Sequence, residues 1–178
     1  MKKELLTILT LLSLISSLSY ADFEKGMSAY KERDYYLAFE YFKPLAESGE
    51  SESQLYLGSI YNKARGDLKN DKESFKWFYK SAEQGNSEAQ YVVARLLGKG
   101  KGTKKNLKSS IEWYKKSAEQ GHARSQWNLG IKYARGSSGL LKNLHKAKYW
   151  IEKSHTNGDD KIKQMSERVW NEYELWKY

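Results

Sequence analysis

Few residues of this chain could carry chemistry, and the histidines are the first to consider. There are three: His122, His145 and His155. No two of them lie four residues apart, and the H-E-x-x-H pattern that puts two metal ligands on one helix face is absent. The chain has no cysteine, which excludes thiolate nucleophiles, disulfides and Cys-based zinc or iron–sulfur sites. We predict no metal and no cofactor.

The motifs of nucleophilic and phosphate-binding sites are also missing. Residues 98–104 read GKGKGTK and lack the G-x-x-x-x-G-K-[ST] spacing of a phosphate-binding loop. Ser137 and Ser138 lie between glycines without the G-x-S-x-G pattern of a hydrolase. Acidic candidates for hydrolysis are Asp67, Asp71, Asp159 and Asp160. They fall in loops or at expected helix starts, where aspartate caps helices. We therefore predict a protein that is not an enzyme, with a cell-wall hydrolase as the alternative.

Lysine is concentrated in one segment of a basic chain. The chain has 31 Lys and Arg against 22 Asp and Glu, a net charge of +9. The dense segment contains Lys99, Lys101, Lys104, Lys105 and Lys108. One interpretation is a solvated loop, and the other is a patch that attracts an acidic protein surface or anionic lipid headgroups.

The first 21 residues have the order of a secretory signal peptide. Two lysines precede an apolar run of 14 residues over 5–18, and small residues at 19 and 21 precede a cleavage point. The run is shorter than the roughly 20 residues that span a bilayer. We predict export to the periplasm, or secretion, of a chain 22–178 without a membrane span; a retained anchor is the alternative. Nucleic acid is not a predicted partner, because an exported protein seldom meets it.

The rest of the chain repeats with a period of 36 or 37 residues. The segment SAEQG at 81–85 recurs at 117–121. Further markers at this spacing are Gln54, Gln90 and Gln126; Trp77, Trp113 and Trp150; and Gly49, Gly85, Gly121 and Gly158. A fixed period of this length indicates stacked supersecondary units. We expect the three tryptophans to fill the seams between units, and each glycine to stop a helix in the left-handed conformation.

Each unit has two segments with helical periodicity and none with a strand pattern. The first helices are expected at about 52–63, 88–98 and 124–134, and the second helices at 71–83, 107–119 and about 144–155. A shorter unit, 23–50, precedes them, and Pro44 is expected to kink its second helix. Residues 161–176 are expected to form one more helix that closes the array. The predicted fold class is all-α.

These residues resemble the Sel-1-like repeat family, a group of tetratricopeptide-like α-solenoids. Residues 113–121, WYKKSAEQG, match the second half of the family's unit, and 54–61 and 126–133 match the first half. Ala94 and Leu97 depart from its glycine and tyrosine. The resemblance implies a right-handed solenoid of stacked helix pairs. Its repeats would span about 23–50, 51–86, 87–122 and 123–159, with a capping helix at 160–178.

The resemblance also implies where a partner would bind, because first helices line the concave face in this family. The candidate residues are Tyr56, Ser59, Ile60, Lys63, Val92, Arg95, Leu96, Lys99, Asn128, Ile131, Lys132 and Arg135. Tyr56, Arg95 and Arg135 are expected to be exposed, whereas Ile60 and Leu96 have burial between helices as their alternative.

The predicted function is non-catalytic binding of another protein, one with an acidic or amphipathic surface. Family members act as interaction scaffolds, often in bacterial envelopes, and some are immunity proteins for secreted toxins. An immunity protein is therefore the alternative within this class. A protein held at a membrane surface by the basic loop is a further alternative. The sequence does not predict an oligomeric state.

Overall fold

The computed structural model describes residues 19–178, and within them all regular secondary structure is helical. The apolar run expected to be the core of a signal peptide, 5–18, lies outside the described residues. In order, the elements are a helix over 19–31, α2 (Tyr35–Glu47), α3 (Ser51–Lys63), the 3₁₀ turn η1 (Gly66–Leu68), α4 (Asp71–Glu83), α5 (Ser87–Lys99), α6 (Leu107–Glu119), α7 (Ala123–Arg135), α8 (Leu144–Asn157), α9 (Asp160–Glu172) and the 3₁₀ turn η2 (Leu175–Lys177).

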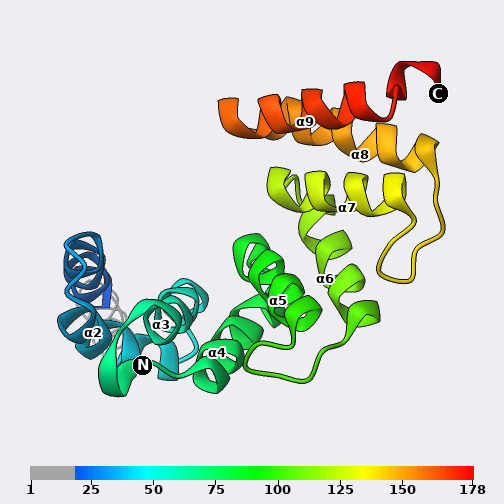
Figure 1. Cartoon of the computed structure of the whole chain (residues 1–178). Coiled ribbons are helices and arrows are strands. Elements are labelled where there is room, and N and C mark those ends of the chain that lie inside the picture. The colour runs from blue at the N-terminus through cyan, green and yellow to red at the C-terminus, as the bar shows by residue number, and fades with distance from the viewer. Residues whose placement is uncertain (1–18) are drawn as a thin grey trace, which may run out of the picture.

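The helices form pairs that stack along an open arc (Figure 1). Consecutive helices from α2 to α9 pack against one another. Figure 1 shows α5 and α7 on the inner side of the arc and α4 and α6 on its outer side. The expected all-α solenoid of helix pairs is confirmed, and the bounds expected for the second helices at 71–83 and 107–119 agree with α4 and α6.

Small residues let the two helices of a repeat approach closely. A Cβ atom on Gly58 would lie 3.0 Å from the ring of Phe78, and one on Gly130 would lie 2.6 Å from Ile151. Ala94 takes the equivalent position in the middle repeat, where its carbonyl accepts a hydrogen bond of 2.6 Å from the Ser110 hydroxyl. Alanine in place of glycine therefore preserves the packing of α5 on α6.

A ladder of buried glutamines joins consecutive repeats. Gln54, Gln90 and Gln126 are all buried near the start of a first helix. Their side-chain amides donate to the carbonyls of Ala46, Ala82 and Ala118. Their side-chain oxygens accept from Gln84, Gln120 and Asn157. Each amide thus adds a hydrogen bond to a carbonyl at the end of the preceding second helix, where the backbone amide of the repeat-ending glycine also donates. This link between repeats explains why glutamine recurs at this spacing.

The repeated tryptophans lie at the seams, as expected. Trp77 is buried, and the ring of Trp113 packs against Tyr79 of α4 with centroids 5.5 Å apart. Trp150 packs against two core clusters, one formed by residues of α5, α6 and α7 and the other by residues of α7, α8, α9 and η2. A lysine covers the outer face of Trp77 and of Trp113, with the Lys80 and Lys116 nitrogens 4.2 Å and 4.4 Å from the ring centroids.

Two expectations about helix ends are wrong. Gly49, Gly85 and Gly121 have positive φ angles, but Gly158 has φ −87° because the chain runs extended from α8 into Asp159, which caps α9. The final helix was expected to reach Trp176, yet α9 ends at Glu172. The chain then turns through left-handed backbone at Glu174 into η2.

Candidate partner-binding surfaces

The inner side of the arc carries a stripe of accessible residues on three consecutive first helices. We define the inner stripe as Glu88, Val92, Arg95 and Lys99 of α5, Arg124, Asn128, Ile131 and Arg135 of α7, and Lys161, Met165, Arg168 and Glu172 of α9. All twelve are exposed or half-buried. Their steps of four, three and four residues keep them on one helix face. Six are Lys or Arg and two are Glu, so this surface is basic.

Three of the predicted site residues are placed differently from expectation. Ile60 and Leu96 are buried, and their side chains belong to the core clusters around Phe42 and Val93. Tyr56 was expected to be exposed but is half-buried, with its ring centroid 5.1 Å from that of Phe42. On α5 the accessible residues lie on the neighbouring face of the helix. Ile60 and Leu96 therefore do not belong to a binding surface.

The N-terminal helix 19–31 contacts Ser59 and Lys63, the other predicted residues of α3. The hydroxyl of Tyr30 lies 2.5 Å from the hydroxyl of Ser59 and accepts a hydrogen bond of 2.6 Å from the Lys63 amine. The ring of Tyr30 also packs against Tyr56, with centroids 5.1 Å apart. The inner face of α3 is therefore engaged by the first repeat, and the accessible inner surface begins at α5.

The predicted residues of α5 and α7 remain accessible, apart from the buried Leu96. Arg95, Lys99 and Arg135 are exposed, and Val92, Asn128 and Ile131 are half-buried. The Arg95 guanidinium lies over the ring of Tyr91, 5.5 Å from its centroid. Arg135 donates a hydrogen bond of 3.1 Å to the Tyr173 hydroxyl, which raises the pKa of the guanidinium.

Lys132 has a structural contact. Its amine donates a hydrogen bond of 2.9 Å to the Ser138 hydroxyl, and burial lowers the pKa of the amine. Lys132 therefore holds the loop 136–143 against α7 and contributes little to the inner stripe.

A pocket of about 200 Å³ opens on the inner stripe between α5, α7 and α9. It is lined by Tyr91, Arg124, Trp127, Asn128, Asp159, Lys161, Ile162 and Met165. The indole nitrogen of Trp127 is buried and has no hydrogen-bond partner among residues 19–178. The prediction from sequence missed Arg124, Trp127 and Lys161. Continuing the helical stripe one turn toward the N-terminus of α7 would have found Arg124. Extending the stripe to the helix expected at 161–176 would have found Lys161.

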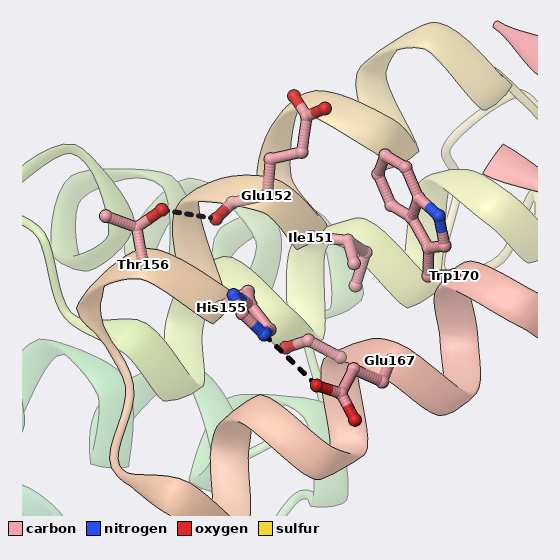
Figure 2. A pocket seen from close by; sticks show the side chains of 7 residues that line it. Ile151, Glu152, His155, Thr156, Glu167 and Trp170 are labelled. Carbon is pink, nitrogen blue, oxygen red and sulfur yellow. Dashed lines mark hydrogen bonds and ion pairs between the residues drawn. The ribbon is translucent and has the colours of Figure 1, made fainter. Parts of the chain in front are cut away.

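A second pocket, of about 300 Å³, lies at the C-terminal end of the solenoid between α8 and α9 (Figure 2). Ile151 and Trp170 form its apolar wall, and Glu152, His155, Thr156, Ser166 and Glu167 complete its lining. Figure 2 shows the His155 imidazole directed at Glu167, and the two side chains are 3.3 Å apart.

The repeat register explains this pocket. Counting 37 residues on from α7, Glu167 takes the position of Gly130, and Trp170 takes that of Tyr133. Gly130 is where the second helix of its repeat, α8, makes its closest approach. The pocket is therefore the place that the second helix of a fifth repeat would occupy. Leu175 of η2 is fully buried against the same helices and fills the remainder of that place.

The lysine-rich loop divides into an anchored part and a free part. Lys101 donates a hydrogen bond of 2.7 Å to the Asn62 side chain and lies 3.3 Å from the Asp71 carboxylate. Burial raises the pKa of Asp71, but the amines of Lys101 and Lys69 beside its carboxylate keep the pKa below its usual value. Lys104, Lys105 and Lys108 are exposed.

The remaining candidates for chemistry serve the scaffold. His122 caps α7 through its Nδ1 atom and contacts Glu88 through Nε2. Asp159 caps α9. In residues 19–178 no three His, Asp or Glu side chains are grouped as metal ligands would be. The helices described over the same range are all too short or too polar to cross a membrane.

Comparison with known proteins agrees with the repeat register. The family model of the Sel1 repeat matches residues 23–50, 51–86, 87–122 and 123–159. A Sel1 repeat protein from Oxalobacter formigenes shares 30% identity with a TM-score of 0.72, and the match covers 79% of this chain and 57% of that one. No curated protein matches the chain by sequence at a significant level.

Two further solved structures share the fold. A protective antigen of uropathogenic Escherichia coli with an SLR fold has 24% identity and a TM-score of 0.74, over 85% of this chain and 33% of that one. Cysteine-rich protein B of Helicobacter pylori has 23% identity and a TM-score of 0.58, over 74% and 94%. The chain thus spans little more than half of the first relative and a third of the second. Four matched repeats, and a solenoid shared with these structures, show that the chain belongs to the Sel1 repeat family, whose fold generally mediates protein–protein interaction.

Proposed function

We propose that this protein is a non-catalytic scaffold, exported to the periplasm or beyond, that binds a partner protein through the inner stripe. The observation that carries the proposal is the pocket between α5, α7 and α9. Its wall includes Trp127 and Met165, and its lining includes Arg124 and Lys161. Aromatic and arginine side chains are the residues that most often dominate binding energy at protein interfaces.

The partner segment is acidic and amphipathic. Six cations in the inner stripe favour approach of a negatively charged segment and raise its association rate. An apolar side chain of the segment enters the pocket against Trp127, and its carboxylates contact Arg95, Arg124 and Lys161. Neither Arg124 nor Lys161 makes an ion pair within residues 19–178, so both are available to a partner.

The test is affinity capture from a native envelope extract with three forms of the exported protein as bait. One form is unchanged, one carries Arg95→Ala, Arg124→Ala and Arg135→Ala, and a control carries Lys43→Ala, Lys76→Ala and Lys153→Ala on outer helices. We expect one dominant protein captured by the first and third baits and lost from the second. Equal capture by all three would remove the inner stripe as the binding surface.

The identity of the captured protein also separates the two roles within this class. A secreted toxin would assign immunity, and neutralisation of that toxin would then depend on Arg95 and Arg124. A component of the envelope would assign assembly. If the bait hydrolysed purified cell wall and lost that activity on Asp159→Asn, the protein would be an enzyme instead.

A further inference from the structure

The loops that join first to second helices form an edge with exposed apolar tips. Loops 100–106 and 136–143 are both long excursions beside α6 (Figure 1). Leu141, at the tip of the second loop, is 88% exposed, the highest exposure of any large apolar residue in 19–178. Leu107, which follows the first loop, is 39% exposed.

Lysines surround these two leucines. We define the basic edge as Lys104, Lys105, Lys108, Lys115 and Lys142 together with Leu107 and Leu141. Four of its lysines are exposed and Lys115 is half-buried. Within residues 19–178, no lysine of the basic edge forms an ion pair. Glu112 is the single acidic residue that lines the pocket between α6 and loop 136–143.

That pocket gives the basic edge an apolar floor. It has a volume of about 420 Å³, and its lining includes Leu107, Ile111 and Leu140. Lys108 and Lys115 also line this pocket, so two basic side chains border the apolar recess. An apolar recess with cations at its rim suits a ligand that has both an anionic head and an apolar chain.

Both loops are held in place from within the fold. Gly102 has a φ of +71° and lies so close to the Asp71 carbonyl that a side chain there would overlap it. Lys101 ties the same loop to Asn62 of α3, and Lys132 of α7 holds the second loop through the Ser138 hydroxyl. The basic edge is therefore presented on anchored loops and needs little ordering when it binds.

From this geometry we infer that the basic edge binds the surface of a bilayer containing anionic lipids. Leu141 and Leu107 insert among the acyl chains near the headgroups, and the lysines contact lipid phosphates. A projecting leucine inserts easily into a fluid bilayer, whereas a protein partner would need a matching pocket. The inner stripe faces the inner side of the arc, whereas α6 lies on its outer side (Figure 1). The inference therefore goes beyond the proposed function and leaves that surface free for a partner.

The test measures co-sedimentation of the exported protein with vesicles. The probes are phosphatidylcholine vesicles with about one third phosphatidylglycerol, and vesicles of phosphatidylcholine alone. We expect binding to the anionic vesicles at low salt, little binding to the neutral ones, and release when salt is raised to about 0.5 M.

Matched variants locate the site. Lys105→Gln with Lys108→Gln should lower the partition coefficient roughly thirtyfold, about fivefold per lysine. Leu141→Ser should lower it by about fivefold to tenfold, because the apolar contact is lost. The control, Lys43→Gln with Lys153→Gln, removes the same charge from the C-terminal halves of α2 and α8 and should bind as the unchanged protein does.

Two results would overturn the inference. Equal losses in the two double variants would mean that net charge alone drives binding. Binding that persists on neutral vesicles and in the Leu141→Ser variant would come from another apolar segment of the exported protein. The variant with Lys105→Gln and Lys108→Gln should still capture the protein partner, whichever vesicle result is obtained. A failure of this inference can therefore be distinguished from a failure of the proposed function.

Discussion

The Nε2 atom of His122 lies 2.8 Å from the Oε2 atom of Glu88, so the residue that caps α7 also binds the first turn of α5. The backbone amide of Ser125 donates to Nδ1, which places the imidazole proton on Nε2 and makes Nε2 the donor to the carboxylate. This hydrogen bond lowers the pKa of Glu88. The contact links the second full repeat to the third.

The pH dependence of stability should reveal this link. Because the pKa of Glu88 is lowered in the folded state, its contribution is complete above the usual glutamate pKa and disappears as the pH falls through the lowered value. Glu88→Gln should therefore cost about 0.5–1 kcal/mol near pH 7, a small effect for a half-exposed pair, and less near pH 4, below the usual glutamate value. Urea unfolding at both pH values measures it. Glu83→Gln, at an exposed position on α4, is the control for the loss of one carboxylate.

The glutamine ladder predicts a loss of stability that is independent of pH. Gln90→Leu removes the hydrogen bonds that the Gln90 side chain makes with the Ala82 carbonyl and the Gln120 amide, which should cost about 1–3 kcal/mol. Thermal or urea unfolding provides the measurement. Gln164→Leu on α9 is the control, since Gln164 is exposed and should change stability by less than about 0.5 kcal/mol. A neutral Gln90→Leu would mean that the ladder does not stabilise the repeats.

Two glycines with similar backbone angles should respond differently to alanine. At Gly102 the new methyl group would overlap the Asp71 carbonyl, so we expect a loss of about 2–4 kcal/mol. At Gly139, φ is +83° and the methyl group would meet open space, so the backbone conformation alone should cost about 1 kcal/mol. Urea unfolding of the two variants measures the difference. Equal losses in the free energy of unfolding would contradict the packing of loop 100–106 on α4.

The short C-terminal turn should stabilise the last two helices. Leu175→Ala removes a fully buried side chain from the cluster with Ala147 and Ile151 and should cost about 2–4 kcal/mol. Hydrogen exchange should show the lost protection mainly in α8 and α9, because repeats contact only their neighbours. Trp176→Ala is the control, since that side chain is half exposed. Uniform loss across all helices would instead mean one cooperative unit.

The helices could be predicted from sequence because their signals are local. Asparagine caps α4, α6 and α8 at positions 70, 106 and 143, and the glycines after α2, α4 and α6 end the repeats. The same reasoning failed after α8 and α9. There, Gly158 serves an extended connection, and the chain folds back at Glu174 so that Leu175 can reach the core.

The candidate site was harder to predict because exposure depends on contacts between distant segments. Tyr56 occupies an inner position, but Tyr30 and Phe42 of the first repeat cover it. Ile60 lies four residues after Tyr56, and Leu96 lies four residues after Val92. A spacing of four residues fits the inner face of a helix and the buried face equally well. Sequence periodicity assigns a face to a helix, and only the packing of the next helix decides whether that face meets solvent.

Glu167 affects how the solenoid ends. It stands where Gly130 lets α8 approach α7, and a helix from a second copy that continued the array would have to cover its carboxylate. Removing that carboxylate from water costs free energy, although His155 lies 3.3 Å from it. An open-ended stack of helix pairs offers the same kind of exposed edge that leads to fibres. The Glu167 carboxylate therefore disfavours the stacking of a second copy on this face of α9.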